Sequence, residues 1–186
     1  MRKLYLFMMM SLDGYFEGPN HDLSWHNAKN EEFKRLEAEH IIETDTIVMG
    51  HMTYDLMASF WPTEAAKKED PETAQFMNET KKYVVAHNSF DPGWKNVTLI
   101  TDNVIERIRE LKNLEGKNIV ILGSNNLCLN LMQAGLVDEL RIMVNPVVLG
   151  EGTQLFKLIR NKISLELIDA RRYKSGNVLL CYRPTL

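Results

Sequence analysis

The segment 118–122, Asn-Ile-Val-Ile-Leu, constrains the fold more than any other part of the sequence. Its four consecutive apolar residues are typical of a strand buried on both faces, as in a parallel sheet covered by helices. Gly123 follows this strand, and a helix is expected from about Asn126, because glycine permits the sharp turn between them. Strand-like and helical runs alternate along the rest of the chain. We therefore expect an α/β fold, in which a mixed, mainly parallel central sheet carries flanking helices on both faces.

The other strands and helices are expected from similar patterns. Apolar runs bounded by turn residues predict strands, and amphipathic runs that begin at a capping residue predict helices. The polar stretch 63–80 predicts a helical or loop excursion. The basic residues Arg171, Arg172 and Lys174 are expected in a solvated hairpin between two strands. The expected strands are Leu4–Ser11, Thr46–Met49, Lys82–Ala86, Val97–Thr101, Glu139–Val148, Ser164–Leu167 and Asn177–Arg183, and the expected helices are Glu31–Glu43, Thr53–Ser59, Asp102–Leu114 and Asn126–Gln133.

The composition indicates one compact domain over residues 1–186, with 45% hydrophobic and 25% charged residues. A net charge of −3 provides no broad attraction to nucleic acid or anionic membranes, and we expect binding to neither. Cys128 and Cys181 lie far apart in apolar stretches, which favours reduced thiols and a cytoplasmic protein. The segment 1–10 begins like a signal peptide, but it is short and lacks a small-residue cleavage site, so it predicts a first strand.

Two strand-to-helix junctions carry the residue types that a phosphate site requires. The segments 50–53 and 123–126 each place a glycine and polar residues where a helix begins, and the first N–H groups of a helix attract anions. A glycine and a capping residue at a single junction usually serve only to form the turn and begin the helix. The G-x-G-x-x-G and Walker A patterns are absent, as are zinc-ligand spacings, so we expect neither an ordinary Rossmann domain nor a metal.

Five segments occur in the order and spacing of one family. The chain resembles the dihydrofolate-reductase-like proteins that include the C-terminal reductase domain of the bifunctional riboflavin-biosynthesis deaminase-reductase. The likeness covers nearly the whole chain, and the last two segments together are far more specific than either glycine junction. The segments are M-S-L-D-G at 10–14, D-T-I-V-M-G-H-M-T-Y at 45–54, L-G-S at 122–124, G-L-V-D-E-L at 135–140, and P-V-V-L-G-E-G at 146–152 with L-F at 155–156.

The resemblance implies an NADPH-dependent reductase. Its acceptor would be a pterin-like or riboflavin-precursor-like heterocycle, the latter of the 5-amino-6-(5-phosphoribosylamino)uracil type, and NADPH would lie across the carboxyl ends of the central strands. Asp13 and Glu32 are implied as catalytic residues, and the residues implied at the substrate are Trp25, Phe33 and Tyr54. The implied cofactor contacts are Met9, Gly50, His51, Met52, Thr53, His87, Asn88, Gly123, Ser124, Asn125, Asn126 and Leu127.

The chain departs from the family pattern where substrate or cofactor phosphate is held. His51 stands where the family often has arginine, and an imidazole lacks the permanent bidentate charge of a guanidinium, so NADPH and NADH both stay open. Leu122 stands where the riboflavin reductase has glutamate, and residues 55–62 replace its D-D-P-x-L-x-x-R stretch. Two alternatives therefore remain: an NADPH-binding module without turnover, and a dihydrofolate reductase proper. The apolar C-terminal strands also allow a homodimer.

Several of the candidate residues have structural alternatives. Asp13 precedes a glycine, as in many turns, and Glu32 favours a helix amino terminus through the helix dipole. Trp25 is as consistent with a lid packed on the core as with stacking on a substrate. The methionine run at 8–10 is most simply explained as core filling, with alternate residues on opposite faces of a strand.

Overall fold

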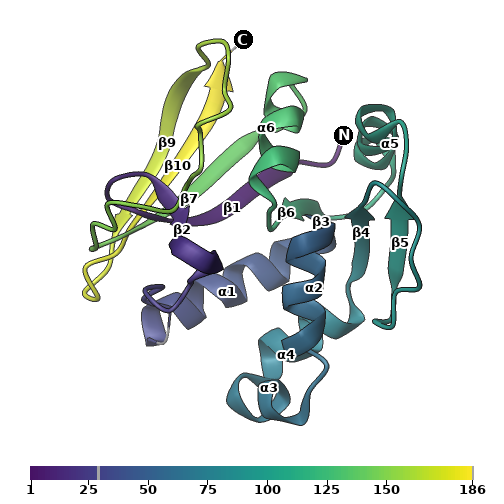
Figure 1. Ribbon diagram of the computed structural model, residues 1–186, viewed down its shortest axis with the longest axis horizontal. Coiled ribbons are helices and arrows are strands. Elements are labelled where there is room, and N and C mark those ends of the chain that lie inside the picture. The colour runs from purple at the N-terminus through teal and green to yellow at the C-terminus, as the bar shows by residue number, and fades with distance from the viewer. Residues whose placement is uncertain (29, 186) are drawn as a thin grey trace.

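A mixed sheet forms the centre of the molecule in the computed structural model, which describes residues 1–28 and 30–185 (Figure 1). The sheet strands within these residues are β1 (Leu4–Ser11), β3 (Thr44–Gly50), β4 (Lys81–Val85), β5 (Val97–Ile100), β6 (Asn118–Ile121), β7 (Glu139–Asn145), β9 (Ser164–Arg172) and β10 (Val178–Thr185). Their order is β5-β4-β3-β6-β1-β7-β10-β9. Neighbours from β5 to β7 in this order run parallel, whereas β10 is antiparallel to β7 and β9. The expected α/β fold with a mainly parallel sheet is confirmed.

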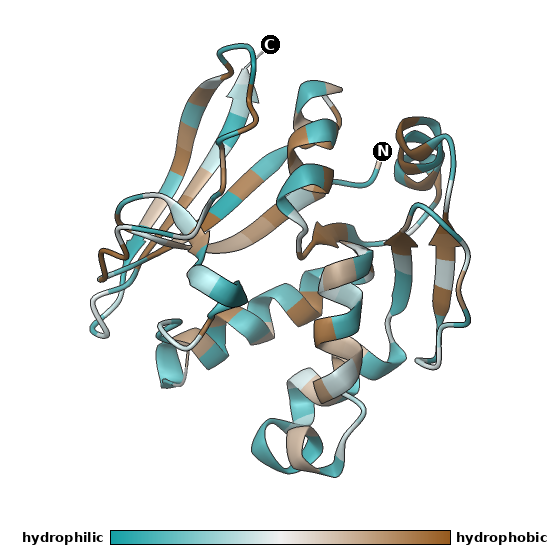
Figure 2. Ribbon diagram, in the orientation of Figure 1, coloured by the Kyte–Doolittle hydropathy of each residue, from teal (hydrophilic) through white to brown (hydrophobic). Residues whose placement is uncertain are grey.

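Helices cover both faces of the sheet. On one face, α5 (Val104–Asn113) and α6 (Asn125–Gln133) contribute to a core cluster with residues of β1, β6 and β7. On the other face lie α1 (Glu31–Glu43), α2 (His51–Phe60) and α4 (Pro71–Glu79). Apolar residues are prominent in β5 and β6, as a doubly covered sheet requires (Figure 2). No helix within the described residues has the length and apolar character needed to cross a membrane.

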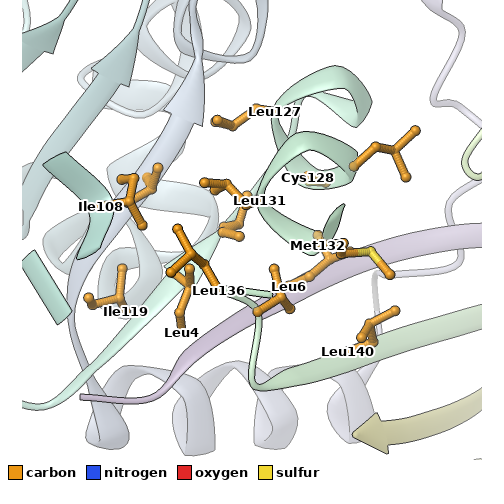
Figure 3. Close-up of a cluster of buried hydrophobic side chains, with 14 of the residues drawn as sticks. Leu4, Leu6, Ile108, Ile119, Leu127, Cys128, Leu131, Met132, Leu136 and Leu140 are labelled. Atoms are coloured by element: carbon orange, nitrogen blue, oxygen red, sulfur yellow. The ribbon is translucent and has the colours of Figure 1, made fainter. Parts of the chain in front are cut away.

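The alternation of side chains along β1 connects the two layers. Leu4 and Leu6 are fully buried against α5 and α6, together with Leu131 and Met132 of α6 (Figure 3). Met8 belongs to the same cluster, whereas Met9 packs on the opposite face with Phe33 of α1, which confirms the expectation for the methionine run. Truncation of a buried leucine to alanine typically costs about 2–5 kcal/mol, so this strand is a large part of what stabilises the fold.

The excursion expected over residues 63–80 is two helices, α3 (Glu64–Glu69) and α4. Thr63 caps α3 by accepting a hydrogen bond from the Ala66 N–H at 3.2 Å. Asp70 caps α4 by accepting one from the Thr73 N–H at 3.0 Å. Both caps are among the residue types that satisfy the first N–H groups of a helix. The local polar sequence therefore forms two short helices rather than a loop.

The three basic residues lie exposed in the hairpin of β9 and β10, as expected, but the first strand of this hairpin is longer than expected. Arg171 and Arg172 lie inside β9, which extends well past the expected end at Leu167, and Lys174 alone lies in the turn. Arg171 favours the longer strand because its guanidinium bonds Glu39 of α1 at 2.6 Å and Asp169 at 2.8 Å. Three short elements were also not expected: β2 (Tyr15–Glu17), η1 (Pro19–His21) and β8 (Thr153–Gln154), with β2 and β8 forming a two-stranded sheet.

Candidate functional site

The two glycine junctions meet at the carboxyl edge of the sheet. β3 and β6 are parallel neighbours, and the Gly50 N–H that follows them donates to the Gly123 carbonyl at 3.0 Å. A β-carbon on Gly123 would come within 2.9 Å of Thr53 Oγ1, and Gly123 has φ = +107°, a conformation that favours glycine. The peptide bond from Gly123 to Ser124 is cis. The two loops therefore form one unit whose close contact requires small residues.

Two helices begin at this unit. The amino-terminal caps of α2 and α6 are Gly50 and Ser124, and neither side chain caps its helix by a hydrogen bond. The Asn126 N–H of α6 donates to Asn125 Oδ1 at 2.8 Å, but the cap side chains accept from neither helix, and both helix starts carry the positive end of the helix dipole. Neighbouring helix starts of this kind suit a diphosphate, which carries two linked anionic groups. The structure brings together the residues expected to bind the cofactor phosphates.

His51 occupies the outer side of this unit. Its ring stacks on Phe90 with the ring centres 4.1 Å apart and an interplanar angle of 10°, and its Nε2 lies 3.6 Å from Asp55 Oδ1. His87 and Asn88 are exposed on the segment that follows β4 and leads to Phe90. His51, at the start of α2, therefore faces the loop after β4, and His87 and Asn88 lie on that loop.

Four of the expected site residues lie in the core instead of presenting their side chains to a ligand. Tyr54 is 5% exposed and packs against Phe90 and Trp94, with its hydroxyl accepting a long hydrogen bond of 3.4 Å from the Trp94 N–H. The others are Met9, Phe33 and Leu127, each less than 9% exposed. Their side chains pack beneath the site, so any contact with a ligand would come from their backbone.

Asp13 ties two loops together at the same edge of the sheet. Its carboxylate accepts hydrogen bonds from the Ser11 hydroxyl at 2.7 Å and from the N–H groups of Leu149 at 3.1 Å and Gly150 at 2.7 Å. Reduced solvation raises the pKa of Asp13, but the hydrogen bonds from Gly150, Ser11 and Leu149 outweigh it and hold the pKa at about 2. At neutral pH the carboxylate is therefore ionised, and its oxygens already accept hydrogen bonds from the chain. A proton donor would need a protonated carboxyl group, so this state does not suit that role.

Glu32 of α1 also joins two segments of the chain through hydrogen bonds to its carboxylate. One carboxylate oxygen accepts from the backbone N–H of Lys174 at 2.7 Å and of Ser175 at 3.3 Å, in the turn between β9 and β10. The contact joins the first turn of α1 to the C-terminal hairpin. The same position also favours the helix dipole, so both interactions of Glu32 are structural.

Trp25 is half-buried in the loop before α1. Its indole N–H donates to the Asp22 carbonyl at 3.0 Å, and its ring meets His26 edge-on at 4.4 Å. Burial lowers the pKa of His26, and its Nε2 has no hydrogen-bond partner among the described residues. The loop is therefore held by its own contacts, with an aromatic pair close to the carboxyl end of β1.

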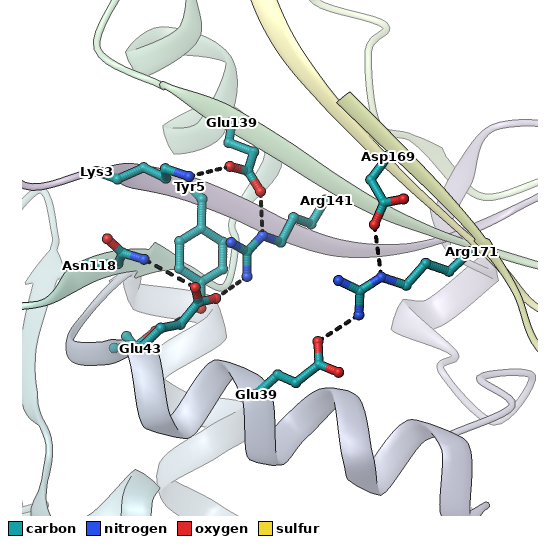
Figure 4. A network of polar contacts seen from close by, with 10 residues as sticks. Lys3, Tyr5, Glu39, Glu43, Asn118, Glu139, Arg141, Asp169 and Arg171 are labelled. Atoms are coloured by element: carbon teal, nitrogen blue, oxygen red, sulfur yellow. Dashed lines mark hydrogen bonds and ion pairs between the residues drawn. The ribbon is translucent and has the colours of Figure 1, made fainter. Parts of the chain in front are cut away.

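A separate charge network lies toward the amino end of β7, away from the glycine junctions (Figure 4). Arg141 pairs with Glu43 of α1 and with Glu139 at 2.7 Å, and it lies 4.0 Å from the centre of the Tyr5 ring. Together with the Arg171 contacts it lines a cavity of about 220 Å³ between α1 and β7, β9 and β10. Every arginine of this cavity is paired with carboxylates, so the network stabilises the packing of α1 and adds no open site. No three histidine, cysteine or acidic residues within the described chain form a group that could hold a metal ion.

The sequence matches the RibD C-terminal domain family over residues 2–179. The chain belongs to this family. The protein YyaP of Bacillus subtilis (strain 168) is 32% identical over 187 residues, which cover 97% of this chain and 94% of YyaP.

Solved structures show how the RibD C-terminal domain fold relates to other reductases. A deaminase/5-amino-6-(5-phosphoribosylamino)uracil reductase from Thermotoga maritima superimposes with a TM-score of 0.71 at 13% identity, covering 99% of this chain and 57% of that chain. A dihydrofolate reductase from Enterococcus faecalis, solved with NADP(H), gives a TM-score of 0.67 at 16% identity, covering 98% and 96%. At these identities the likeness is one of fold. The dihydrofolate-reductase-like fold is thereby confirmed.

Sequence reasoning missed an asparagine cluster in this RibD C-terminal domain. Asn27, Asn145 and Asn177 are hydrogen-bonded to one another, although they are far apart in the sequence. Asn27 and Asn177 lie in turn or loop segments and Asn145 is the last residue of β7, positions where asparagine is common for local reasons. The sequence therefore contained no signal that distinguished them from ordinary turn residues.

Proposed function

We propose that this RibD C-terminal domain is an NADPH-dependent reductase that transfers hydride to a pterin-like or riboflavin-precursor-like heterocycle. The observation that carries the proposal is the joined pair of glycine junctions at Gly50 and Gly123, each at the start of a helix. Membership of the family and the fold shared with a dihydrofolate reductase that binds NADP(H) support it.

The residues fit such a cofactor. The N–H groups at the starts of α2 and α6 would hold its diphosphate, with the Thr53 and Ser124 hydroxyls beside them. His51, His87 and Asn88 would lie toward the adenosine side. Once bound, the dihydronicotinamide supplies a hydride, and the chain's own residues hold it against the acceptor and exclude water.

Reduction of a C=N bond requires a hydride at carbon and a proton at nitrogen. Asp13 and Glu32 were the expected catalytic acids, yet both carboxylates already accept hydrogen bonds from the chain. We assign them to the positioning of loops around the acceptor. Asp13→Asn is expected to lower turnover without removing a pKa from the pH profile of kcat, because Asp13 stays ionised through the working range.

The acceptor side of α2 favours a molecule with an apolar body. From His51 to Phe60 the helix contains no lysine or arginine, and Met52, Leu56 and Phe60 are 63%, 49% and 40% exposed. A phosphoribosyl group would find no guanidinium or ammonium on this helix. A heterocycle without phosphate, such as a pterin or a dephosphorylated aminouracil, fits the surface better.

Cofactor titration followed by an acceptor panel tests the proposal. NADPH should raise the melting temperature and quench tryptophan fluorescence in a saturable manner, and NADH should serve as the comparison. A panel of pterins, aminouracils with and without phosphate, and dihydropyrimidines should then reveal turnover. Absence of NADPH binding would contradict the proposal. Binding without turnover would favour a module that does not catalyse, and tight methotrexate binding would favour a dihydrofolate reductase proper.

A homodimer through β9 is part of the proposal. This edge strand is exposed over nearly its whole length, and Leu165, Leu167 and Ile168 are 41%, 54% and 44% exposed. A long edge strand with exposed apolar residues can pair through its free N–H and C=O groups with a strand of another chain. Light scattering should give twice the monomer mass, and Leu167→Glu should return the mass to that of a monomer.

A further inference from the structure

Asn27 is held by groups from strand β7 and from the turn between β9 and β10. Its N–H donates to Asn145 Oδ1 at 2.9 Å, at the end of β7. Its side-chain amide donates to Asn177 Oδ1 at 3.1 Å and to the Ser175 carbonyl at 3.0 Å, and the Asn177 amide returns a bond of 3.0 Å to the Asn27 carbonyl. Both the backbone and the side chain of Asn27 are thereby fixed.

The partners of Asn27 are themselves immobilised. Asn145 is fully buried and donates to the Met143 carbonyl at 3.2 Å and more weakly to the Met10 carbonyl at 3.4 Å. Asn177 is 2% exposed. Because a buried amide that loses its partner suffers the full cost of desolvation, this cluster strongly favours one arrangement.

The cluster lies at the edge of the sheet that carries the candidate site. β1 and β7 are parallel, with Ser11 opposite Asn145, so Asn145 lies at their carboxyl ends. The glycine junctions follow the carboxyl ends of β3 and β6 in the same parallel part of the sheet. Asn27 comes two residues after Trp25, the aromatic residue expected at the acceptor.

The same C-terminal turn also holds the start of α1. Glu32 accepts the N–H groups of Lys174 and Ser175. Asn30 caps α1 by accepting from the Phe33 N–H at 2.9 Å, and its amide donates to the Asn27 carbonyl at 3.2 Å. The turn from 173 to 177 thus holds the end of the Trp25 loop and the first turn of α1 in one assembly.

We infer that Asn145 and Asn177 are positioning residues of the reductase, which hold the Trp25 loop over the acceptor through their hydrogen bonds to Asn27. The inference rests on the proposed function. Reduction requires the acceptor carbon to lie within contact distance of the hydride, and a displacement of about 1 Å can cost about a hundredfold in rate. Within residues 1–28 and 30–185, no hydrogen bond joins Gly50 or Gly123 to the three asparagines, so the effect of the cluster should fall on the acceptor and not on the cofactor.

Kinetics of Asn177→Ala test this role. The variant should bind NADPH within about twofold of the wild type, while kcat/KM for the best acceptor of the panel should fall at least about tenfold. Asn27→Ala should produce a similar loss, and the double variant should lose less than the two single effects added together, because the bond from the Asn27 amide to Asn177 Oδ1 is removed by either change. Lys174→Ala is the matched control: its side chain is exposed, only its backbone bonds Glu32, and it should keep wild-type kinetics.

The outcomes separate the inference from the proposed function. Wild-type kcat/KM in Asn177→Ala would overturn the positioning role while leaving the reductase intact. A parallel loss of NADPH affinity and of turnover would also overturn it, since that is the result of general destabilisation. If Asn177→Ala does not fold, Asn27→Ala tests the role alone, because it removes the bond to Asn177 Oδ1 at a less buried position, and it should show the same selective loss. A wild-type protein that neither binds NADPH nor reduces any acceptor would overturn the function and this role with it.

Discussion

A β-carbon on Gly50 would lie 2.7 Å from the hydroxyl oxygen of Ser124, closer than two such atoms approach. Gly50→Ala must therefore displace the Ser124 hydroxyl, and its β-carbon also comes within 3.3 Å of the Ser124 backbone nitrogen, at a typical cost of about 1–3 kcal/mol for an overpacked contact. We expect its NADPH dissociation constant to rise at least about tenfold, because the Ser124 hydroxyl and N–H lie at the start of α6, where the diphosphate would bind. Isothermal titration calorimetry measures this change.

Gly93→Ala is the control for the glycine prediction. An added β-carbon there meets nothing within 4 Å, and Gly93 does not have a positive φ. It should bind NADPH like the wild type. Equal affinities for the two variants would show that the contact between the junctions does not shape the cofactor site.

Lys82 is a buried cap for the end of α4. Its ammonium donates to the carbonyls of Met77 at 2.8 Å, Thr80 at 2.7 Å and Asn78 at 3.3 Å, and it lies 4.5 Å from the centre of the Trp94 ring. Lys82→Met leaves these carbonyls without their charged donor. We expect a loss of about 2–4 kcal/mol in the free energy of unfolding, measured by urea titration. The control is Lys81→Met, which replaces the exposed neighbour of Lys82 and should change the free energy of unfolding by less than about 0.5 kcal/mol.

Glu37 makes the free energy of unfolding depend on pH near neutrality. Burial, followed by repulsion from Asp70, raises the pKa of Glu37 from 4.5 to about 7. Between these values the folded state binds a proton that the unfolded chain releases, so the free energy of unfolding should decrease as pH rises through this window. Glu37→Gln should flatten that decrease and be more stable than the wild type at about pH 8.

Urea titrations at four pH values from about 5 to 8 check the prediction for Glu37. The control is Glu72→Gln, which removes an exposed carboxylate from α4 and should preserve the wild-type slope. The prediction is wrong if the two variants show the same dependence on pH.

Leu56 should influence the choice of acceptor. Thr53 lies against Gly123, and Leu56 and Phe60 follow three and seven residues later, so helix geometry places them toward the same side of α2. Leu56→Lys should raise KM for a phosphate-free heterocycle and lower it for the phosphorylated form of the same compound. Ser59→Lys places the charge further round the helix and should change the ratio of the two KM values less. An unchanged ratio in Leu56→Lys would remove this residue from the acceptor surface.

Both thiols should be inert in the native protein. Cys128 is fully buried and burial raises its pKa to about 12, and Cys181 is 6% exposed with a pKa also raised by burial. Since the thiolate is the reactive form, a thiol reagent should label neither residue until denaturant is added. Rapid labelling of one thiol in the native state would show that its region opens readily.

The sequence predicted those parts of the fold that depend on local pattern. The double-sided apolar run of β6 identified the buried parallel sheet, and the glycines at 50 and 123 marked both junctions. It failed where the decisive contact comes from elsewhere in the chain. The length of β9 depends on Arg171 reaching Glu39 of α1, and the fixed loop at Asn27 depends on the C-terminal hairpin. Asp13 was expected to be a catalytic acid because the sequence does not show which N–H groups donate to its carboxylate. Those donors, Leu149 and Gly150, are far away in the chain.

The position of β1 has a consequence for biosynthesis. β1 precedes both of its sheet neighbours in the chain and lies between β6 and β7, with Leu4 opposite Ile119 and Tyr5 opposite Glu139. The apolar residues of β1 therefore stay without their sheet partners until residues 118–145 have been synthesised, and strands with such distant partners fold slowly and expose apolar surface meanwhile. During translation, β1 is therefore a segment whose apolar residues need protection from aggregation until β7 has emerged.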